Sequence, residues 1–312
     1  MATKDHQSEP IESASETLQR IFDGHGSVLG SQMADESSRY DVLKKTDFPK
    51  PQRTRRIAVA NQKGGVGKTT STVNTAAALA NKGAQVLVID MDPQGNASTA
   101  LGVSHASGEP SVYDVIEGRS DLGDVITVCP DFPTLDVVPA SIDLSGAELE
   151  VADLPNRNTL LKEALDLYLR QSDKHYDYVF IDCPPSLGLL VINAMCAVTE
   201  MLIPIQAEYY ALEGLNQMLK TVDLVKRKLN PSLELEGVVF TMYDARTNLS
   251  LQVVESVKSN LNQTIYKTII PRNVRLAEAP SHGMSINHYS SRSTGAESYR
   301  MLAAEVISRG EV

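Results

Sequence analysis

Short apolar runs alternate along this chain with longer segments of helical periodicity. The runs rich in β-forming residues are IAVAN, VLVID, LDVVPA, YVFID, EMLIPI, LEGVVFTM and YKTII. Helical patterns separate most of them, over residues 69–83, 158–170, 187–197, 212–229 and 249–261, and a last one covers 296–308. Because strands that alternate with helices pair in parallel, the pattern predicts an α/β fold with a doubly wound, mainly parallel sheet and helices on both faces.

The first part of the chain has a different character. Residues 1–54 are rich in Ser, Asp, Glu and Gly and end in a stretch with two prolines and a basic cluster, so we expect a disordered tail and linker. Within the tail, the apolar residues of segment 11–22 can lie on one face of a helix. We favour a transient helix there over a helix that docks on a partner. Residues 55–312 are expected to form the folded domain.

Composition excludes several classes of protein. No stretch approaches the roughly 20 apolar residues that span a bilayer, and the N-terminus lacks a secretory signal pattern. The three cysteines form no C-x-x-C pair, so a reducing cytoplasm fits best. The formal net charge is -10, yet residues 220–312 hold 12 Lys and Arg against 9 Asp and Glu. The last third is thus the only part of the chain with a basic balance, which charges scattered over a solvated surface would equally explain.

A glycine-rich segment between the first strand and the first helix has the chemistry of a phosphate-binding loop. Its residues are Lys63, Gly64, Gly65, Val66, Gly67, Lys68, Thr69 and Thr70. Glycines let backbone N–H groups approach a triphosphate, and the N-terminus of the following helix favours the same anion. We expect Lys68 to contact the β- and γ-phosphates and the Thr69 hydroxyl to bind Mg²⁺, so ATP and Mg²⁺ are the predicted cofactors.

The loop departs from the usual G-x-x-x-x-G-K-[ST] pattern. Gln62 replaces the first glycine, and Lys63 adds a positive charge on the far side of the loop's glycines. We expect Lys63 to point outward and to reach the nucleotide of a second subunit, where it would neutralise charge at the γ-phosphate.

Two predicted strands end in carboxylates. VLVID is followed by Met-Asp-Pro, which places Asp90 and Asp92 at one strand end, and YVFID places Asp182 at another. A magnesium nucleotide site needs such groups at the carboxyl edge of a parallel sheet. We expect Asp182 to hold Mg²⁺ directly or through water, and Asp90 to support the loop or the metal's surroundings.

Several long motifs resemble those of the ParA/MinD superfamily, and most closely the Soj-type chromosomal ParA ATPases. They are NQKGGVGKTTSTVN, VLVIDMDPQGNAS, YDYVFIDCPPSLGLLVINA, IPIQAEYYALEGL, and DARTNL followed by IIPRNVRLAEAPSHG. The resemblance covers about residues 55–307 and implies that Lys63 is the family's signature lysine. It also implies that Gly64 admits the partner backbone and that Asp92 positions the attacking water. The catalytic set is then Lys63, Lys68 and Asp92, and the metal set is Thr69, Asp92 and Asp182.

For the last third of the chain, the resemblance implies contacts to the base and to DNA. Pro271 and Asn273 are candidates for contacting adenine. Arg246 and Arg275 match positions that the family uses on phosphate backbones. Further candidates for DNA binding are Arg272, Lys258 and Lys267. Since the chain has no Trp and few aromatic residues among these charges, we expect binding to be non-specific and strongly dependent on salt.

The resemblance implies an ATPase that segregates chromosome or plasmid origins. ATP would drive formation of a sandwich homodimer that binds double-stranded DNA, and a ParB-type centromere-binding protein would stimulate hydrolysis and release the dimer. We expect a cytoplasmic, nucleoid-associated protein that does not bind membranes, with a polar scaffold as a candidate partner of the tail. The alternatives are a MinD-like membrane-cycling ATPase, an iron–sulfur carrier and a metabolic P-loop ligase. The short C-terminus without a basic face, the cysteine spacing and the lack of a small-substrate motif argue against them.

Overall fold

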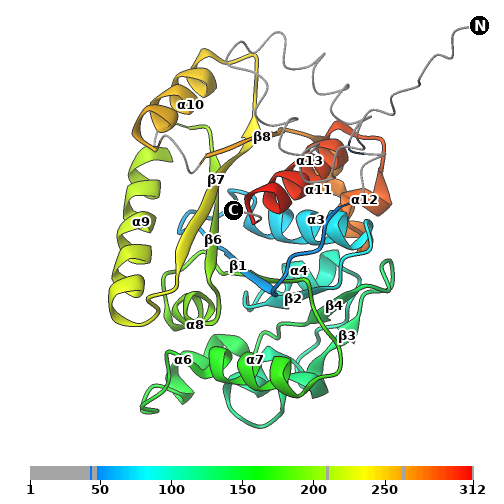
Figure 1. Cartoon of the computed structure of the whole chain (residues 1–312), viewed down its shortest axis with the longest axis vertical. Helices are drawn as coiled ribbons and strands as arrows, with labels where there is room; N and C mark the ends of the chain where they lie inside the picture. The colour runs from blue at the N-terminus through cyan, green and yellow to red at the C-terminus, as the bar shows by residue number, and fades with distance from the viewer. Residues whose placement is uncertain (1–42, 44–47, 209–210, 262–264, 311–312) are drawn as a thin grey trace, which may run out of the picture.

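The computed structural model describes residues 43, 48–208, 211–261 and 265–310. Within them a single sheet of eight strands runs through the molecule in the order β3-β4-β2-β5-β1-β6-β7-β8 (Figure 1). The strands are β1 (Arg55–Val59), β2 (Val86–Asp90), β3 (Thr127–Val128), β4 (Leu135–Val138), β5 (Tyr178–Asp182), β6 (Glu200–Gln206), β7 (Glu234–Tyr243) and β8 (Ile265–Pro271). All neighbouring pairs are parallel except β3 with β4. The predicted doubly wound, mainly parallel fold is confirmed.

Helices cover both faces of the sheet. They are α3 (Lys68–Ala80), α4 (Asn96–Ala100), α5 (Val112–Ile116), α6 (Leu144–Glu150), α7 (Leu160–Gln171), α8 (Leu189–Ala197), α9 (Ala211–Lys228), α10 (Asn248–Asn260), α11 (Val274–Glu278), α12 (Ile286–Tyr289) and α13 (Thr294–Arg309). Two short 3-10 helices, η1 (Leu122–Val125) and η2 (Ala279–His282), complete the described elements.

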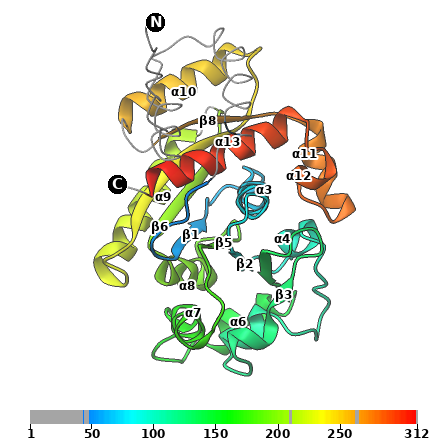
Figure 2. The same ribbon diagram turned by 45° about the vertical axis from the view of Figure 1, so that its right-hand side comes forward.

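The two faces of the sheet bury separate hydrophobic cores. On one face, α3, α4, α12 and α13 pack over β1, β2 and β8. The other face is covered by α5 to α10, with α8 and α9 against β1, β6 and β7. Figure 2 shows α13 crossing above α3, with α7 and α8 below the strands. Helix α3 is composed largely of Ala, Ser and Thr and is almost wholly buried, since small side chains let it lie between the sheet and α13.

The long predicted elements are present, and the differences lie in the short ones. The segment between β2 and α7 contains α4, α5, η1, β3 and α6, none of which the pattern predicted. These elements have two to seven residues, too few to show a period. Leu43 and Phe48, which precede the predicted domain boundary at residue 55, pack with the core around α3. The boundary itself remains a prediction.

The register of the central strands aligns the residues that matter for chemistry. Asp90 at the end of β2 lies opposite Asp182 at the end of β5, and Asp182 in turn lies opposite Val59 at the end of β1. The chain leaves β1 there and enters the glycine-rich loop. Three strand ends therefore meet at one point of the carboxyl edge, where ligands of open α/β sheets bind.

Candidate functional site

The glycine-rich loop joins β1 to α3 and ends in a left-handed turn. Gly65 has φ 73° and Gly67, the N-cap of α3, has φ 87°, a region that residues with a Cβ rarely adopt. No side chain caps the N-terminus of α3, so its first N–H groups remain available to an anion. The local conformation is that of a phosphate cradle.

Side chains from distant elements hold this loop in place. The Thr241 hydroxyl on β7 donates to the carbonyl oxygen of Val66 at 2.7 Å and lies 3.1 Å from that of Ile205. Asn61 accepts a hydrogen bond from the backbone N–H of Lys63 at 3.0 Å and donates to Pro204 at 2.7 Å. Both anchors connect the loop to β6 and β7, so the cradle is fixed before any nucleotide arrives.

Lys68, Thr69 and Asp182 lie together, as predicted. The Thr69 hydroxyl donates to one oxygen of Asp182 at 2.7 Å, and the Thr72 hydroxyl lies 3.0 Å from the other. Lys68 is buried, and its Nζ donates to the carbonyl oxygen of Lys63 at 3.2 Å across the loop. Burial lowers the pKa of Lys68, an effect that the nearby carboxylates oppose.

Asp90 and Asp92 adjoin this group, also as predicted. Asp90 is fully buried and accepts hydrogen bonds from the backbone N–H and the hydroxyl of Ser98, both at 2.8 Å, and from the N–H of Asp92 at 3.1 Å. Asp90 thereby fixes the turn that contains Asp92 and the start of α4. Asp92 is also buried and accepts a hydrogen bond from the N–H of Gln94 at 3.0 Å.

The carboxylates give this site an excess of buried negative charge. Burial, followed by the charge of Asp90, raises the pKa of Asp182, and burial likewise raises the pKa of Asp90. The oxygen donors of Thr69 and Asp182 suit Mg²⁺, which relieves such repulsion. No cluster of three or more His, Cys, Asp or Glu in the described chain could hold a metal.

Lys63 is directed away from these carboxylates. Its Nζ forms an ion pair with Glu208, the second residue after β6, at 2.6 Å, and both side chains are about half exposed. A Cβ added at the neighbouring Gly64 would meet nothing within 4 Å, and Gly64 has no positive φ. The fold of this chain alone does not require glycine there.

The candidate DNA-binding residues form two groups. Arg246 and Arg272 lie near the carboxyl ends of β7 and β8, where both act on Asp244, and Arg275 follows on α11. Lys258 lies near the end of α10, and Lys267 lies early in β8, at the end of that strand opposite to Pro271. Arg246 pairs with Asp244 at 2.7 Å and Arg275 with Glu278 at 2.9 Å, so acidic neighbours offset part of the positive charge.

Of the two candidate adenine contacts, Pro271 ends β8 and Asn273 caps α11. The Asn273 side chain accepts from the N–H of Arg275 and donates to the Thr294 hydroxyl, both at 2.8 Å. These bonds position the loop after β8. The contacts to adenine remain predictions.

Sequence reasoning missed several residues of the site. Thr72, Ser98, Asn61, Thr241 and Glu208 were not selected, although each bonds a predicted site residue or its loop. Asn61 and Glu208 closely follow β1 and β6, so a search for polar residues after every strand would have found them. Thr72, Ser98 and Thr241 lie within helices or a strand and gave no such signal.

Comparison with known proteins defines the class. A family profile described as an AAA domain matches residues 54–235, which include the phosphate loop and the strand ends with Asp92 and Asp182. A structure of cobyrinic acid a,c-diamide synthase from Mycobacterium smegmatis with bound ATP analog and magnesium aligns with a TM-score of 0.70. The two are 36% identical over 80% of this chain and 92% of that one. Together with the geometry of the loop, these matches define a P-loop ATPase that uses ATP and Mg²⁺.

The curated relatives narrow the class to a family. The sporulation initiation inhibitor protein Soj of Bacillus subtilis is 53% identical over 254 residues, which cover 81% of this chain and 98% of Soj. The chromosome partitioning protein ParA of Caulobacter vibrioides is 47% identical, over 81% of this chain and 94% of ParA. The septum site-determining protein MinD of Pyrococcus horikoshii, with Mg-ADP, is 27% identical with a TM-score of 0.66. The chain belongs to the Soj/ParA family of chromosome-partitioning ATPases.

Proposed function

We propose that this ATPase segregates DNA through an ATP-dependent sandwich dimer that binds double-stranded DNA without sequence preference. ATP joins two subunits, the dimer holds nucleoid DNA, and hydrolysis stimulated by a ParB-type centromere-binding protein releases it. The cargo is a chromosome origin or, in the same mechanism, a plasmid.

The orientation of the Lys63 side chain is the observation that supports the proposed dimer. Its ammonium group lies outside the cradle that Lys68 and Thr69 form, so it cannot act on a nucleotide in its own subunit without moving. The open space at Gly64 leaves room for another backbone to approach. A second subunit that faces this surface would receive Lys63 at its γ-phosphate, where charge develops during phosphoryl transfer.

The proposed roles of the other residues follow from their positions. Lys68 and the N–H groups of the loop bind the phosphates, and Thr69 and Asp182 hold the metal ion, with Asp92 near it. Asp92 also positions the attacking water. The chemistry that Mg²⁺ supplies is neutralisation of charge on the phosphate oxygens.

DNA binding is assigned to the exposed arginines near the carboxyl ends of β7 and β8. Arg246, Arg272 and Arg275 lie on consecutive segments there, and a guanidinium pairs well with phosphate oxygens. To bind DNA phosphates, Arg246 must leave Asp244 and Arg275 must leave Glu278, so DNA binding by one subunit is weak. Two copies in a dimer raise the affinity through multivalency.

A MinD-like membrane cycle is the less supported alternative. Helix α13, the last described helix, has most of its apolar side chains buried against α3 and β8 and is not free to lie on lipid. Among the described helices, none combines the length and apolar character needed to cross a bilayer. The proposed polar scaffold partner concerns the tail, which is outside the described residues apart from Leu43 and residues 48–54.

The test is DNA binding with ATP, ADP and no nucleotide, each at two salt concentrations. We expect retention only with ATP, and a loss of at least about tenfold when salt rises from about 50 to about 200 mM, because phosphate contacts release counterions. Arg275→Glu should abolish retention while ATP-dependent dimerisation, measured by light scattering, stays normal. Retention of DNA by this variant, or a monomer with Mg-ATP when hydrolysis is blocked, would contradict the proposal.

A further inference from the structure

The turn that holds Asp92 continues directly into α4. The carbonyl oxygen of Asp92 accepts a hydrogen bond from the N–H of Gly95 at 2.9 Å, and the carbonyl oxygen of Gly95 accepts one from the N–H of Thr99, also at 2.9 Å. Gly95 is buried, forms the N-cap of α4 and has φ 62°. A shift of Gly95 or of the first turn of α4 is therefore passed on to Asp92.

The imidazole ring of His105 covers this turn. Its Nε2 lies 2.8 Å from the hydroxyl oxygen of Thr99, within hydrogen-bond distance. A Cβ added at Gly95 would meet three atoms of the ring at 3.0 Å or less, so the ring occupies the space that a side chain at Gly95 would take. The left-handed φ and the neighbouring ring both require glycine at this position. His105 thus contacts both ends of the first turn of α4.

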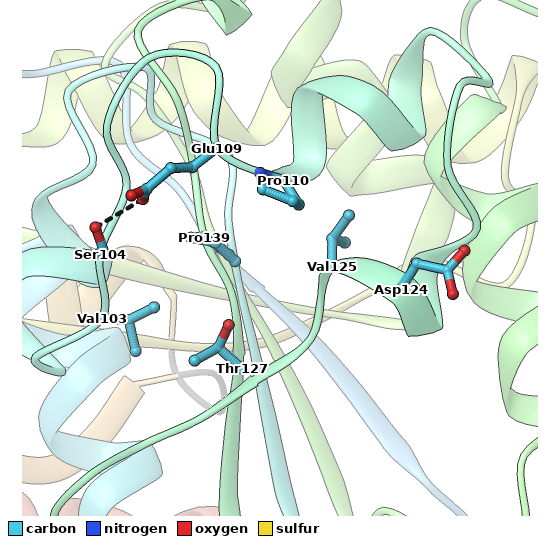
Figure 3. Close-up of a pocket in the computed structure, with 8 residues that line it drawn as sticks. All are labelled: Val103, Ser104, Glu109, Pro110, Asp124, Val125, Thr127 and Pro139. Carbon is cyan, nitrogen blue, oxygen red and sulfur yellow. Dashed lines mark hydrogen bonds between the residues drawn. The ribbon is translucent and has the colours of Figure 1, made fainter.

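The segment between α4 and α5, which carries His105, is itself anchored on both sides of the ring. Before His105, the Ser104 hydroxyl donates a hydrogen bond to Glu109 at 2.6 Å (Figure 3). After it, the Ser107 hydroxyl donates to Asp143, the N-cap residue of α6, at 3.0 Å. These bonds hold the backbone of the segment in place and so keep the half-buried His105 ring against the turn.

Helix α4 is therefore held from its buried side and from its solvent side. On the buried side, the Ser98 hydroxyl donates to Asp90 at 2.8 Å. On the solvent side, the exposed Thr99 bonds His105. Loss of the outer contact lets this five-residue helix tilt about Ser98, and the tilt moves the turn with Asp92. A displacement of about 1 Å in a group that orients reactants can cost about 100-fold in rate.

We propose that His105 is a positioning residue for ATP hydrolysis. Through Gly95 and Thr99 it holds the turn in the place where Asp92 orients the attacking water toward the γ-phosphate. The ring itself takes no part in the transfer of protons or of the phosphoryl group. The inference rests on the proposed function, since it depends on the role of Asp92.

Substitutions at two positions isolate the contact between the ring and α4. His105→Asn removes the nitrogen that reaches the Thr99 hydroxyl, whereas His105→Gln places an amide at the distance of Nε2 from the backbone and keeps a partner for it. Thr99→Val removes the hydroxyl and keeps the shape of the side chain. The matched control is His175→Asn, the same substitution at a histidine that precedes β5 and is 65% exposed.

The assay is single-turnover hydrolysis of Mg-ATP by an excess of the full-length protein, with the Kd of a non-hydrolysable ATP analogue measured in parallel. We expect His105→Asn and Thr99→Val each to slow hydrolysis about fivefold, because the water is less well oriented. The Kd should stay within about twofold of wild type, since the loop from Lys63 to Thr70 holds the phosphates. His105→Gln should recover about half of the lost rate or more. The double variant should be no slower than either single one, because both remove the same contact.

The outcomes distinguish this inference from the proposed function. If Asp92→Ala loses hydrolysis while His105→Asn keeps the wild-type rate, the positioning role of His105 is wrong and the role of Asp92 stands. A parallel loss of rate and of analogue affinity, a loss in the control, or no recovery in His105→Gln also overturns the positioning role, because the effect would then be a general one on folding. If Asp92→Ala hydrolyses ATP normally, the role of Asp92 fails, and the role of His105 with it.

Discussion

The ion pair between Lys63 and Glu208 is expected to weaken formation of the proposed dimer. In the single chain Glu208 holds the Lys63 ammonium at 2.6 Å, outside the cradle. If Lys63 acts on the nucleotide of the second subunit, this pair must break in both subunits when the dimer forms. Glu208→Gln removes the charge but keeps the size of the side chain, so it should favour the dimer.

The size of the effect follows from the exposure of the pair. The two side chains are 47% and 48% exposed, so solvent screens the attraction to about 0.5 kcal/mol. Breaking two such pairs costs about 1 kcal/mol, and relief of that cost tightens dimerisation about fivefold. The gain should shrink as salt rises, because exposed charges are screened beyond about 10 Å at about 0.1 M.

The assay is sedimentation velocity with a non-hydrolysable ATP analogue over a range of protein concentrations. The control is Glu213→Gln, which removes an exposed acidic group five residues along the chain. Thermal unfolding of both variants should stay within about 0.5 kcal/mol of wild type. Weaker dimerisation of Glu208→Gln would refute the reasoning, because it would mean that Glu208 stabilises the dimer interface and does not compete with it.

Three further predictions concern the nucleotide site. Burial raises the pKa of Asp182 to about 8, so ionisation of this group lowers the free energy of unfolding of the nucleotide-free protein. This destabilisation is absent below about pH 4 and complete only above about pH 8. Asp182→Asn should therefore raise the unfolding temperature by about 5 °C at about pH 8.5 and by less as the pH falls. The same variant should lose Mg-ATP hydrolysis. An unfolding temperature below that of the wild type at about pH 8.5 would contradict this reasoning. Thr241→Val leaves the buried carbonyl of Val66 without its donor, so urea denaturation should show a loss of about 1–2 kcal/mol and titration should show weaker ATP binding. Asp92→Ala should bind ATP and DNA but hydrolyse ATP at least about 100-fold more slowly in a phosphate-release assay, and normal turnover would disprove its role.

Much of the site could be predicted because its chemistry is local in the chain. The loop from Lys63 to Thr70 follows a strand and precedes a helix, and its glycine spacing is sufficient to identify a phosphate cradle. Asp90, Asp92 and Asp182 end apolar runs, and strand ends of a parallel sheet share one edge. The long strands and helices were predictable for the same reason, since each shows several periods of its own pattern.

The order of the strands and the contacts across them were decided only by the tertiary structure. Asp90 faces Asp182 because β2 pairs with β5 in that register, which no local pattern specifies. Thr241 lies 175 residues from Val66 along the chain, and Glu208 lies 145 residues from Lys63. The short elements between β2 and α7 were equally hidden, because packing against the sheet determines them. Sequence periodicity reports on which face of an element is buried, whereas the partners of that face depend on contacts between segments far apart in the chain.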